Sequence, residues 1–261
     1  MGRVSADTVP HHQGRITNNL NTGVLFMDGD TNVADDSRAL LIRARLKTPR
    51  AAAIAGILFS VLLMYSLWLL RLSIPSDPAD TGAWLETSAK RVSFALNLVP
   101  IAGIAFMWFI GVLRDRLGRQ EDQFFATVFL GSGLLCLGML FVAAAATGGL
   151  IRAYSVQQRA MFDGATFAFG RAFTFDIMHI YAFKMAAVFM ITASTLALRT
   201  RITARWIAAL GYACAAFLLL GSGYLDWALF AFPAWVLLVS IYILVDNLRG
   251  TASMALNADD R

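Results

Sequence analysis

The stretch AAAIAGILFSVLLMYSLWLLR, residues 51–71, decides the fold of this chain. It carries no charged residue before Arg71, at its end. A helix rises about 1.5 Å per residue, so about 20 residues cross the roughly 30 Å hydrocarbon layer of a bilayer. Lipid offers the backbone no hydrogen bonds, so such a segment satisfies its own backbone groups as a helix. The stretch therefore predicts a membrane-spanning helix.

Similar apolar stretches recur along the rest of the chain. They lie at about 92–113, 125–151, 173–198, 206–224 and 228–245. The whole chain of 261 residues is 58% hydrophobic and 15% charged, whereas soluble domains are about 45–50% apolar and about 25% charged. A soluble protein of this composition would have too little polar surface to cover itself. The sequence predicts an all-α, polytopic transmembrane helix bundle of about six spans.

Lysine and arginine gather on one side of the predicted bundle. If the spans alternate in direction, one side receives Arg38, Arg43, Arg45, Lys47, Arg50, Arg114, Arg116, Arg119, Arg199, Arg201, Arg205 and Arg249. The other side holds Arg71, Lys90, Arg91, Arg152, Arg159 and Arg171, with several acidic residues among them. Basic residues mark the cytoplasmic side of a membrane protein, so we expect both termini in the cytoplasm. The net charge of +5 then reflects topology, and we expect no nucleic-acid partner.

The segments outside the spans predict three further regions. Residues 1–36 are polar and turn-rich, which predicts a disordered cytoplasmic tail. Residues 37–50, SRALLIRARLKTPR, form a basic amphipathic juxtamembrane segment. It is either a short helix on the anionic inner leaflet or only the signal that orients the first span, and the pattern leaves both open. Residues 51–249 form the six-helix transmembrane domain, and residues 250–261 a short cytoplasmic tail.

The most polar part of any predicted span is FDIMHIYAFKM, residues 175–185. It contains Asp176, His179, Tyr181 and Lys184. At about 100° per residue, Asp176, His179 and Lys184 fall within one arc of about 140° on a helical wheel. A lysine near the bilayer centre costs about 2.5–3.5 kcal/mol on insertion scales, so it is rarely there without a reason. The pattern predicts a polar face turned towards the bundle interior.

Depth matching adds two residues to this candidate site. Asn97 of the second span and Tyr65 of the first lie at similar predicted depths in the outer half. Together with Asp176, His179, Tyr181 and Lys184 they form a candidate ligand-binding or ion-binding site. Two other interpretations stay open. The polar residues could form a purely structural network, or Asp176 could sit among the headgroups while Lys184 extends partly towards them.

Other local patterns predict packing and anchoring. Gly56-x-x-x-Ser60 and Gly211-x-x-x-Ala215 have the small-residue spacing that lets membrane helices approach closely. Trp84 is expected to anchor the first outer loop at the membrane interface. The phenylalanine-rich stretch before residue 175 is expected to lie at the headgroup level.

Patterns typical of catalytic and metal sites are not found in the sequence. No nucleophile, base and orienting group can be assembled, and no set of Cys and His has zinc-ligand spacing. His179 is the only histidine outside the N-terminal tail, which rules out a haem held by two intramembrane histidines. We therefore expect no cofactor and no metal, and the sequence favours a protein that is not an enzyme.

The run AFMWFIGVLRDRLGRQEDQFFATVFLGSGLLCLGMLFVAAA, residues 105–145, resembles a group of uncharacterised multi-pass membrane proteins of high-GC bacteria. The likeness covers the chain from about Thr48 to Arg249. It implies the bacterial inner membrane and no known activity.

Two classes of function follow from these observations. The first is transport, or binding of a small ligand or ion, at the polar site in the outer half of the bundle. The second is a non-catalytic accessory or scaffold subunit of a membrane complex. The expected partners are the lipid bilayer and either another membrane protein or further copies of this chain.

Overall fold

The computed structural model describes the backbone of residues 27–75, 82–117, 123–157, 165–200, 203–221 and 226–259. Side chains are described for residues 50–75, 82–114, 124–156, 165–200, 203–221 and 227–249. Throughout these ranges the regular structure is helical, which confirms the predicted all-α class. The chain divides into two compact units, Met1–Arg45 and Leu46–Arg261. The membrane-spanning helices lie in the second unit.

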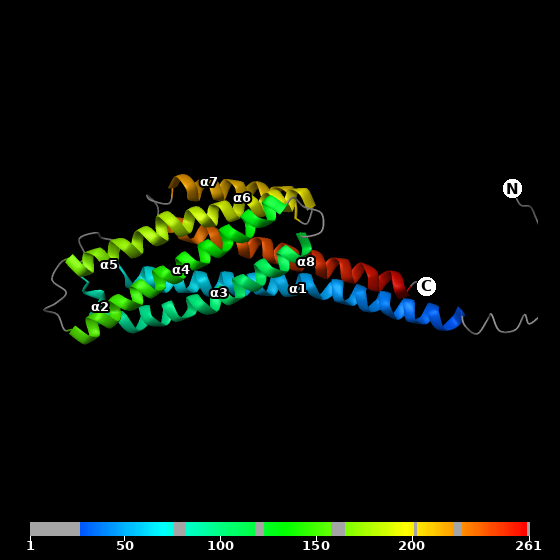
Figure 1. The fold of residues 1–261 in the computed structure, drawn as a ribbon, viewed down its shortest axis with the longest axis horizontal. Coiled ribbons are helices and arrows are strands. Elements are labelled where there is room, and N and C mark those ends of the chain that lie inside the picture. The colour runs from blue at the N-terminus through cyan, green and yellow to red at the C-terminus, as the bar shows by residue number, and fades with distance from the viewer. Residues whose placement is uncertain are drawn as a thin grey trace, which may run out of the picture. The chain divides into compact units, whose positions relative to one another are not determined.

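The helices follow one another with short connections. They are α1 (Met27–Ser73), α2 (Trp84–Thr87), α3 (Ala89–Leu117), α4 (Gln123–Gln157), α5 (Ala165–Asp176), the π-helix η2 (Ile177–Ala182), α6 (Phe183–Thr200), α7 (Arg205–Gly221), the 3₁₀-helix η3 (Asp226–Phe230) and α8 (Ala231–Asp259). Within the second unit the long helices run alternately in opposite directions (Figure 1). The end of this unit that holds α2 and the start of α5 is called the α2 end.

Five helical segments are long and apolar enough to cross a membrane. They are Arg50–Ser73, Ala89–Arg114, Phe124–Val156, Ala165–Thr200 and Trp227–Arg249. The sixth predicted span is the shorter apolar helix α7, whose 17 residues stand at the lower limit for crossing. It packs against α6 and α8. The membrane-protein class predicted from the sequence is confirmed.

The middle of the bundle is an aromatic cluster built on Phe106 of α3. Its ring stacks on Phe59 of α1, with centroids 4.4 Å apart. It meets Phe189 of α6 and Phe232 of α8 edge to face, at 5.3 Å and 5.6 Å. All four rings are buried. Each such ring pair adds about 0.5–1.5 kcal/mol beyond its buried area, so the cluster holds four helices together.

Small residues set the closest helix contacts, as the sequence predicted. A Cβ atom added at Gly56 of α1 would collide with the Ser240 Oγ atom of α8. One added at Gly211 of α7 would collide with the Ser194 Oγ atom of α6, and it would lie 2.8 Å from the Trp235 Nε1 atom of α8. Only a residue without a side chain permits these approaches, which confirms the predicted role of both glycines.

The predicted tails differ from the structure in one respect. α1 begins at Met27, so residues 27–36 are helical where the sequence predicted disorder, and residues 1–26 lie outside the described residues. Residues 37–50 belong to the same helix without a break before the span. α8 likewise continues to Asp259. Adding a residue to an existing helix costs far less than starting one, so long spans extend into polar sequence that has no apolar periodicity.

The described part of the phenylalanine-rich stretch, residues 165–175, is helical and continues into the following span. α5, η2 and α6 form one continuous helical segment, Ala165–Thr200. Its 36 residues measure about 54 Å, well beyond the roughly 30 Å of hydrocarbon. Phe167 of α5 is buried against Trp84 and Val92. This part of the stretch therefore packs against helices of the same chain at the α2 end.

Candidate cavity at the α2 end

A cavity of about 200 Å³ opens at the α2 end of the bundle, between residues of α1, α2, α4, α5, η2 and η3. The polar residues that line it are Arg71, Trp84, Thr147, Arg171, Thr174 and His179. The remaining lining residues are leucine, isoleucine, methionine, phenylalanine and proline. Thr147 and Thr174 donate their hydroxyl hydrogens to carbonyls of their own helices. The arginines and the histidine therefore give the cavity its polar character.

Arg71 and Arg171 reach the cavity from different helices. Arg71 lies in the last turn of α1, and its guanidinium lies over the Trp227 ring, 5.1 Å from the centroid. Arg171 of α5 donates a hydrogen bond from Nη2 to the Pro75 carbonyl at 3.2 Å. Guanidinium groups are cationic and form forked hydrogen bonds that match carboxylate and phosphate. Two of them on one small cavity make it favourable for an anion.

Trp84 is brought to the cavity by a turn at Gly82. Gly82 has φ of +83°, a conformation that glycine adopts readily, and α2 begins two residues later. Trp84 is only 6% exposed and packs with Leu85, Val92 and Phe167. Its indole N–H is buried and has no hydrogen-bond partner within the described residues. The predicted role of Trp84 as an interfacial anchor is wrong, because its ring is part of the protein interior.

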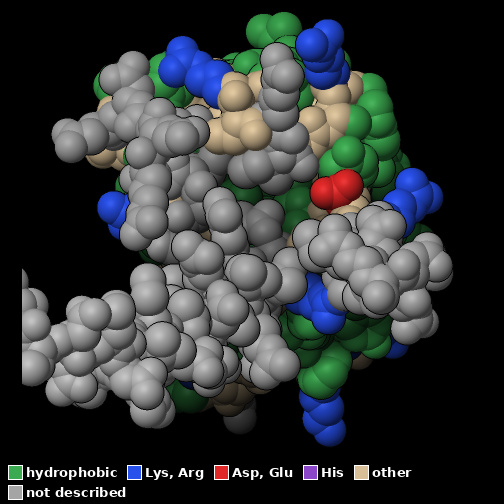
Figure 2. Space-filling model, turned by 90° about the vertical axis from the view of Figure 1, so that its right-hand side faces the viewer, with side chains coloured by type: hydrophobic (Ala, Val, Ile, Leu, Met, Phe, Trp, Pro, Cys, Tyr) green, Lys and Arg blue, Asp and Glu red, His purple; other side chains and the backbone are tan. Residues whose placement is uncertain are grey.

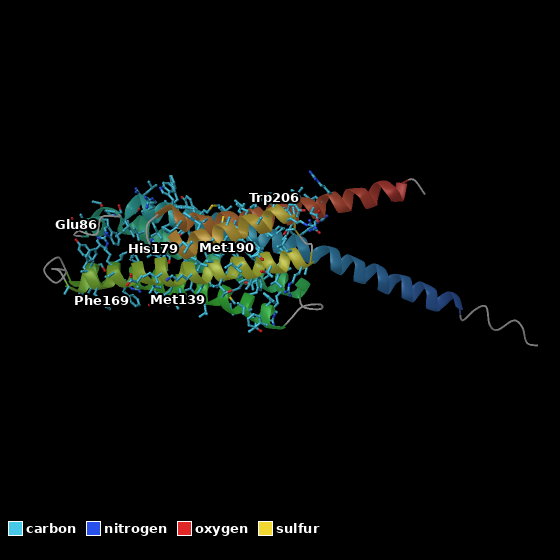
Figure 3. The ribbon with its side chains drawn as sticks, turned by 90° about the horizontal axis from the view of Figure 1, so that it is seen from above. Glu86, Met139, Phe169, His179, Met190 and Trp206 are labelled. Carbon is cyan, nitrogen blue, oxygen red and sulfur yellow. The ribbon has the colours of Figure 1, made fainter. Side chains whose placement is uncertain are left out.

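His179 is the predicted site residue that does line the cavity. It lies on η2, with its ring stacked on Phe175 at 3.9 Å and edge to face with Phe183 at 5.6 Å. Its Nδ1 atom lies 3.0 Å from the Phe175 carbonyl oxygen, which can only accept, so Nδ1–H is the donor. Figure 3 shows His179 towards the Glu86 end of the bundle, with Met190 further along and Trp206 near the other end. Single π-helical turns are frequent at functional sites, because they offset the regular helix.

The other five predicted site residues do not converge on His179. Asp176, Tyr181 and Lys184 are exposed on the outer surface of the α5–α6 segment, and Tyr65 of α1 is 50% exposed. Asn97 lines a separate groove between α3 and α4. The six-residue site predicted in the outer half is therefore not assembled.

The direction in which the polar face turns explains this result. Ala182, Ala186 and Ala187 are fully buried, and their side of the segment packs against neighbouring helices, α4 among them. In lipid, small residues favour such close contacts, so they take the inner face and the charged face turns outward. A helical wheel shows which residues share a face but not where the face points. The spacing Ala182-x-x-x-Ala186 is the signal that would have indicated the inner face.

Sequence reasoning missed the residues that build the cavity. Arg71 and Arg171 were assigned only to the outer-side charge, and they are far apart in the chain. No local pattern joins two such positions. Within the described ranges no group of three or more His, Cys, Asp or Glu residues could hold a metal ion. The arrangement suits an anionic group held by Arg71 and Arg171, with its apolar part against the remaining walls.

The fold and the cavity define the class of this protein: it is a helical membrane protein with a partly polar, cationic cavity at one end of its bundle. Comparisons with protein-family models, with curated proteins and with solved structures found no match.

Proposed function

We propose that this membrane protein binds a small amphipathic anion in the cavity at the α2 end. The observation that carries the proposal is that Arg71 and Arg171 line one cavity whose other walls are mainly apolar. Ligand sites commonly combine apolar walls with a few well-placed polar groups. A carboxylate or phosphate would lie at the guanidiniums, and a short hydrocarbon chain would lie against the apolar walls.

The size of the cavity limits the ligand. Its volume of about 200 Å³ is below the roughly 300–1,000 Å³ of sites for drug-sized molecules. An organic anion of about the size of decanoate, or the headgroup and first carbons of an anionic lipid, fits this volume. Both share one chemistry, an anionic group on an apolar chain.

The aromatic cluster favours binding over open conduction. Phe59, Phe106, Phe189 and Phe232 are buried and in mutual contact in the middle of the bundle. Transport through the bundle would require these rings to separate, whereas binding at the α2 end requires no such movement. We therefore place a binding function before transport.

The orientation that we propose puts the α2 end outside the cell and both termini in the cytoplasm, in a bacterial inner membrane. If the spans alternate in direction, most lysine and arginine residues of the sequence are expected on the side opposite the α2 end. In Figure 2, which looks onto that opposite end, several blue Lys and Arg side chains stand at the rim of the view beside green hydrophobic side chains. The positive-inside rule and the resemblance to bacterial membrane proteins support this placement.

Ligand-dependent thermal stability of the purified chain in a neutral detergent tests the binding function. Decanoate is compared with decanol, which has the same chain without the charge, and with acetate, which has the charge without the chain. A ligand that binds only the folded state raises the melting temperature with its concentration. Of the three compounds, we expect only decanoate to raise the melting temperature. Equal effects of decanoate and decanol would contradict an anion site.

Matched variants assign the effect to the cavity. Arg71→Gln and Arg171→Gln should each reduce the decanoate effect, while Arg91→Gln should leave it unchanged. Arg91 is exposed near the start of α3, at the same end of the bundle, and is not among the residues that line the cavity. A second arm uses lipid nanodiscs with phosphatidylglycerol or phosphatidylcholine. Stabilisation by phosphatidylglycerol that depends on both arginines would identify the headgroup of an anionic lipid as the source of the anion.

The second candidate function is that of an accessory subunit in a membrane complex. It is favoured by the exposed charge of Lys184 in the span Ala165–Thr200. The two functions are compatible, because the cavity and Lys184 use different surfaces of the segment.

A further inference from the structure

Lys184 lies on the surface of the bundle, deep within a membrane-spanning segment. It is the second residue of α6 and is exposed. Between Asp176 and Arg199 it is the only Asp, Glu, Lys or Arg. Residues 177–198 measure about 33 Å along a helix, which matches the roughly 30 Å of hydrocarbon. Lys184 therefore lies about 12 Å deeper than Asp176, inside the apolar layer.

The exposed face around Lys184 is formed mainly by residues of its own helical segment. Ile180 and Tyr181 are 38% and 54% exposed and share its face, whereas Ala182 and Phe183 are buried on the other face. Within the described residues, none forms a hydrogen bond or an ion pair with the Lys184 side chain. Charged residues in membrane spans almost always face the bundle interior or a water-filled cavity and have a partner. The exposed position therefore requires a partner from outside this bundle.

We propose that a membrane helix of a different polypeptide covers this face and places an Asp or Glu carboxylate at the depth of Lys184. Charge complementarity selects this occupant, because a carboxylate is the side chain that pairs most strongly with an ammonium. Tyr181 lies three residues before Lys184 on the same exposed face. Residues three apart on a helix are neighbours, so its hydroxyl can donate to the same carboxylate.

A second copy of this chain does not meet the requirement. Two copies related by an axis along the membrane normal place equal residues at equal depth. The six apolar helical segments contain two acidic residues, Asp176 and Asp246. Asp176 is about 12 Å from the depth of Lys184, and Asp246 stands three residues before the end of its span at Arg249. A neighbouring copy would therefore bring no carboxylate from these segments to the depth of Lys184.

The inference does not rest on the proposed ligand, because Lys184 is not among the residues that line the cavity.

The first test of the inference uses synthetic membrane helices of leucine and alanine with either glutamate or glutamine at the centre. Energy transfer between a labelled peptide and the purified chain in phosphatidylcholine vesicles reports association. Polar contacts between membrane helices are worth about 0.6–2 kcal/mol, so the glutamate peptide should bind about threefold to thirtyfold more tightly.

Variants separate the lysine from general peptide binding. The preference for glutamate should vanish in Lys184→Met. It should remain in Lys90→Met, because Lys90 lies at the start of α3, outside the middle of any span. Equal binding of the two peptides to the unaltered chain would overturn the proposal, as would a preference that survives Lys184→Met.

The second test identifies the occupant in the cell. A photo-cross-linking residue at Tyr181, in membranes of the source cells, is compared with one at Leu135, which is 52% exposed on α4. We expect Tyr181 to give an adduct with another polypeptide that carries Asp or Glu within a membrane helix. The adduct should be lost in Lys184→Glu and restored when that acidic residue is changed to lysine. Adducts with lipid alone, or with a second copy of this chain, would overturn the proposal.

Discussion

The imidazole of His179 lies nearly parallel to the ring of Phe175, four residues earlier in the same helical segment. The two centroids are 3.9 Å apart and the planes differ by 17°. The Nδ1–H group of the histidine donates to the Phe175 carbonyl at 3.0 Å. The segment itself therefore orients the ring, through both a stacking contact and a hydrogen bond. Asp176, the neighbour expected to act with His179, points its side chain to the exposed surface instead.

The first prediction concerns this histidine. His179→Phe keeps an aromatic ring between Phe175 and Phe183 but removes the ring nitrogens. We expect a change in the free energy of unfolding of about 1 kcal/mol or less, because one modest hydrogen bond is lost. The decanoate-induced rise in melting temperature should be smaller than in the unaltered chain. An unchanged decanoate effect would place His179 outside the binding site.

Trp84→Phe tests the buried indole donor. A buried donor without a partner costs about 1–3 kcal/mol, so removing it offsets the loss of packing area. Without ligand the variant should be as stable as the unaltered chain or slightly more so. With decanoate it should be stabilised as much as the unaltered chain, because the buried indole nitrogen has no surface open to the anion. A loss of several kcal/mol without ligand would instead show that the indole ring is needed for packing with Val92 and Phe167.

Gly56→Ala should destabilise the bundle by about 1–3 kcal/mol, the usual cost of overpacking a close contact. The added methyl group would collide with Ser240 Oγ of α8. The matched control is Gly138→Ala on α4, where a Cβ atom meets nothing within 4 Å. That change should be neutral or stabilising, because alanine favours a helix over glycine by about 0.5–1 kcal/mol. Thermal melting in detergent measures both, and equal effects would contradict the close contact.

Asp176 and Lys184 provide a test of coupling between two exposed charges. They lie about 12 Å apart along the segment, so their interaction should be small. The effects of Asp176→Asn and Lys184→Met on the melting temperature in detergent should therefore add in the double variant. A coupling of more than about 0.5 kcal/mol would show that the two side chains share a polar site after all.

Topology is tested by cysteine labelling in intact cells, after Cys136 and Cys214 have been replaced by alanine. A cysteine at Ser76 or Gln157 should react with an impermeant reagent from outside, and one at Gln120 should be protected. This follows from the excess of basic residues on the side that includes Gln120. Labelling of a cysteine at Gln120 from outside would show that the chain has the opposite orientation. The cavity would then open to the cytoplasm.

Several features of this protein could be predicted from local sequence. The positions of the apolar helices, the all-α class and the close contacts at Gly56 and Gly211 all agree with the structure. Hydrocarbon thickness and the need to satisfy every backbone group act on each segment separately. A span can therefore be recognised from about twenty consecutive residues, and small-residue spacing indicates a contact face within one helix.

The candidate site depended on the tertiary structure. The face of the α5–α6 segment with Asp176, Tyr181 and Lys184 turns outward, because the alanines on its other side pack against neighbouring helices. The cavity forms only where Arg71 of α1, Trp84 of α2 and Arg171 of α5 meet. Rotation of each helix about its axis is set by side-chain packing with several neighbours at once. No single stretch of sequence contains that information, so the sequence alone determined the spans and the packing of the bundle decided which polar residues share a site.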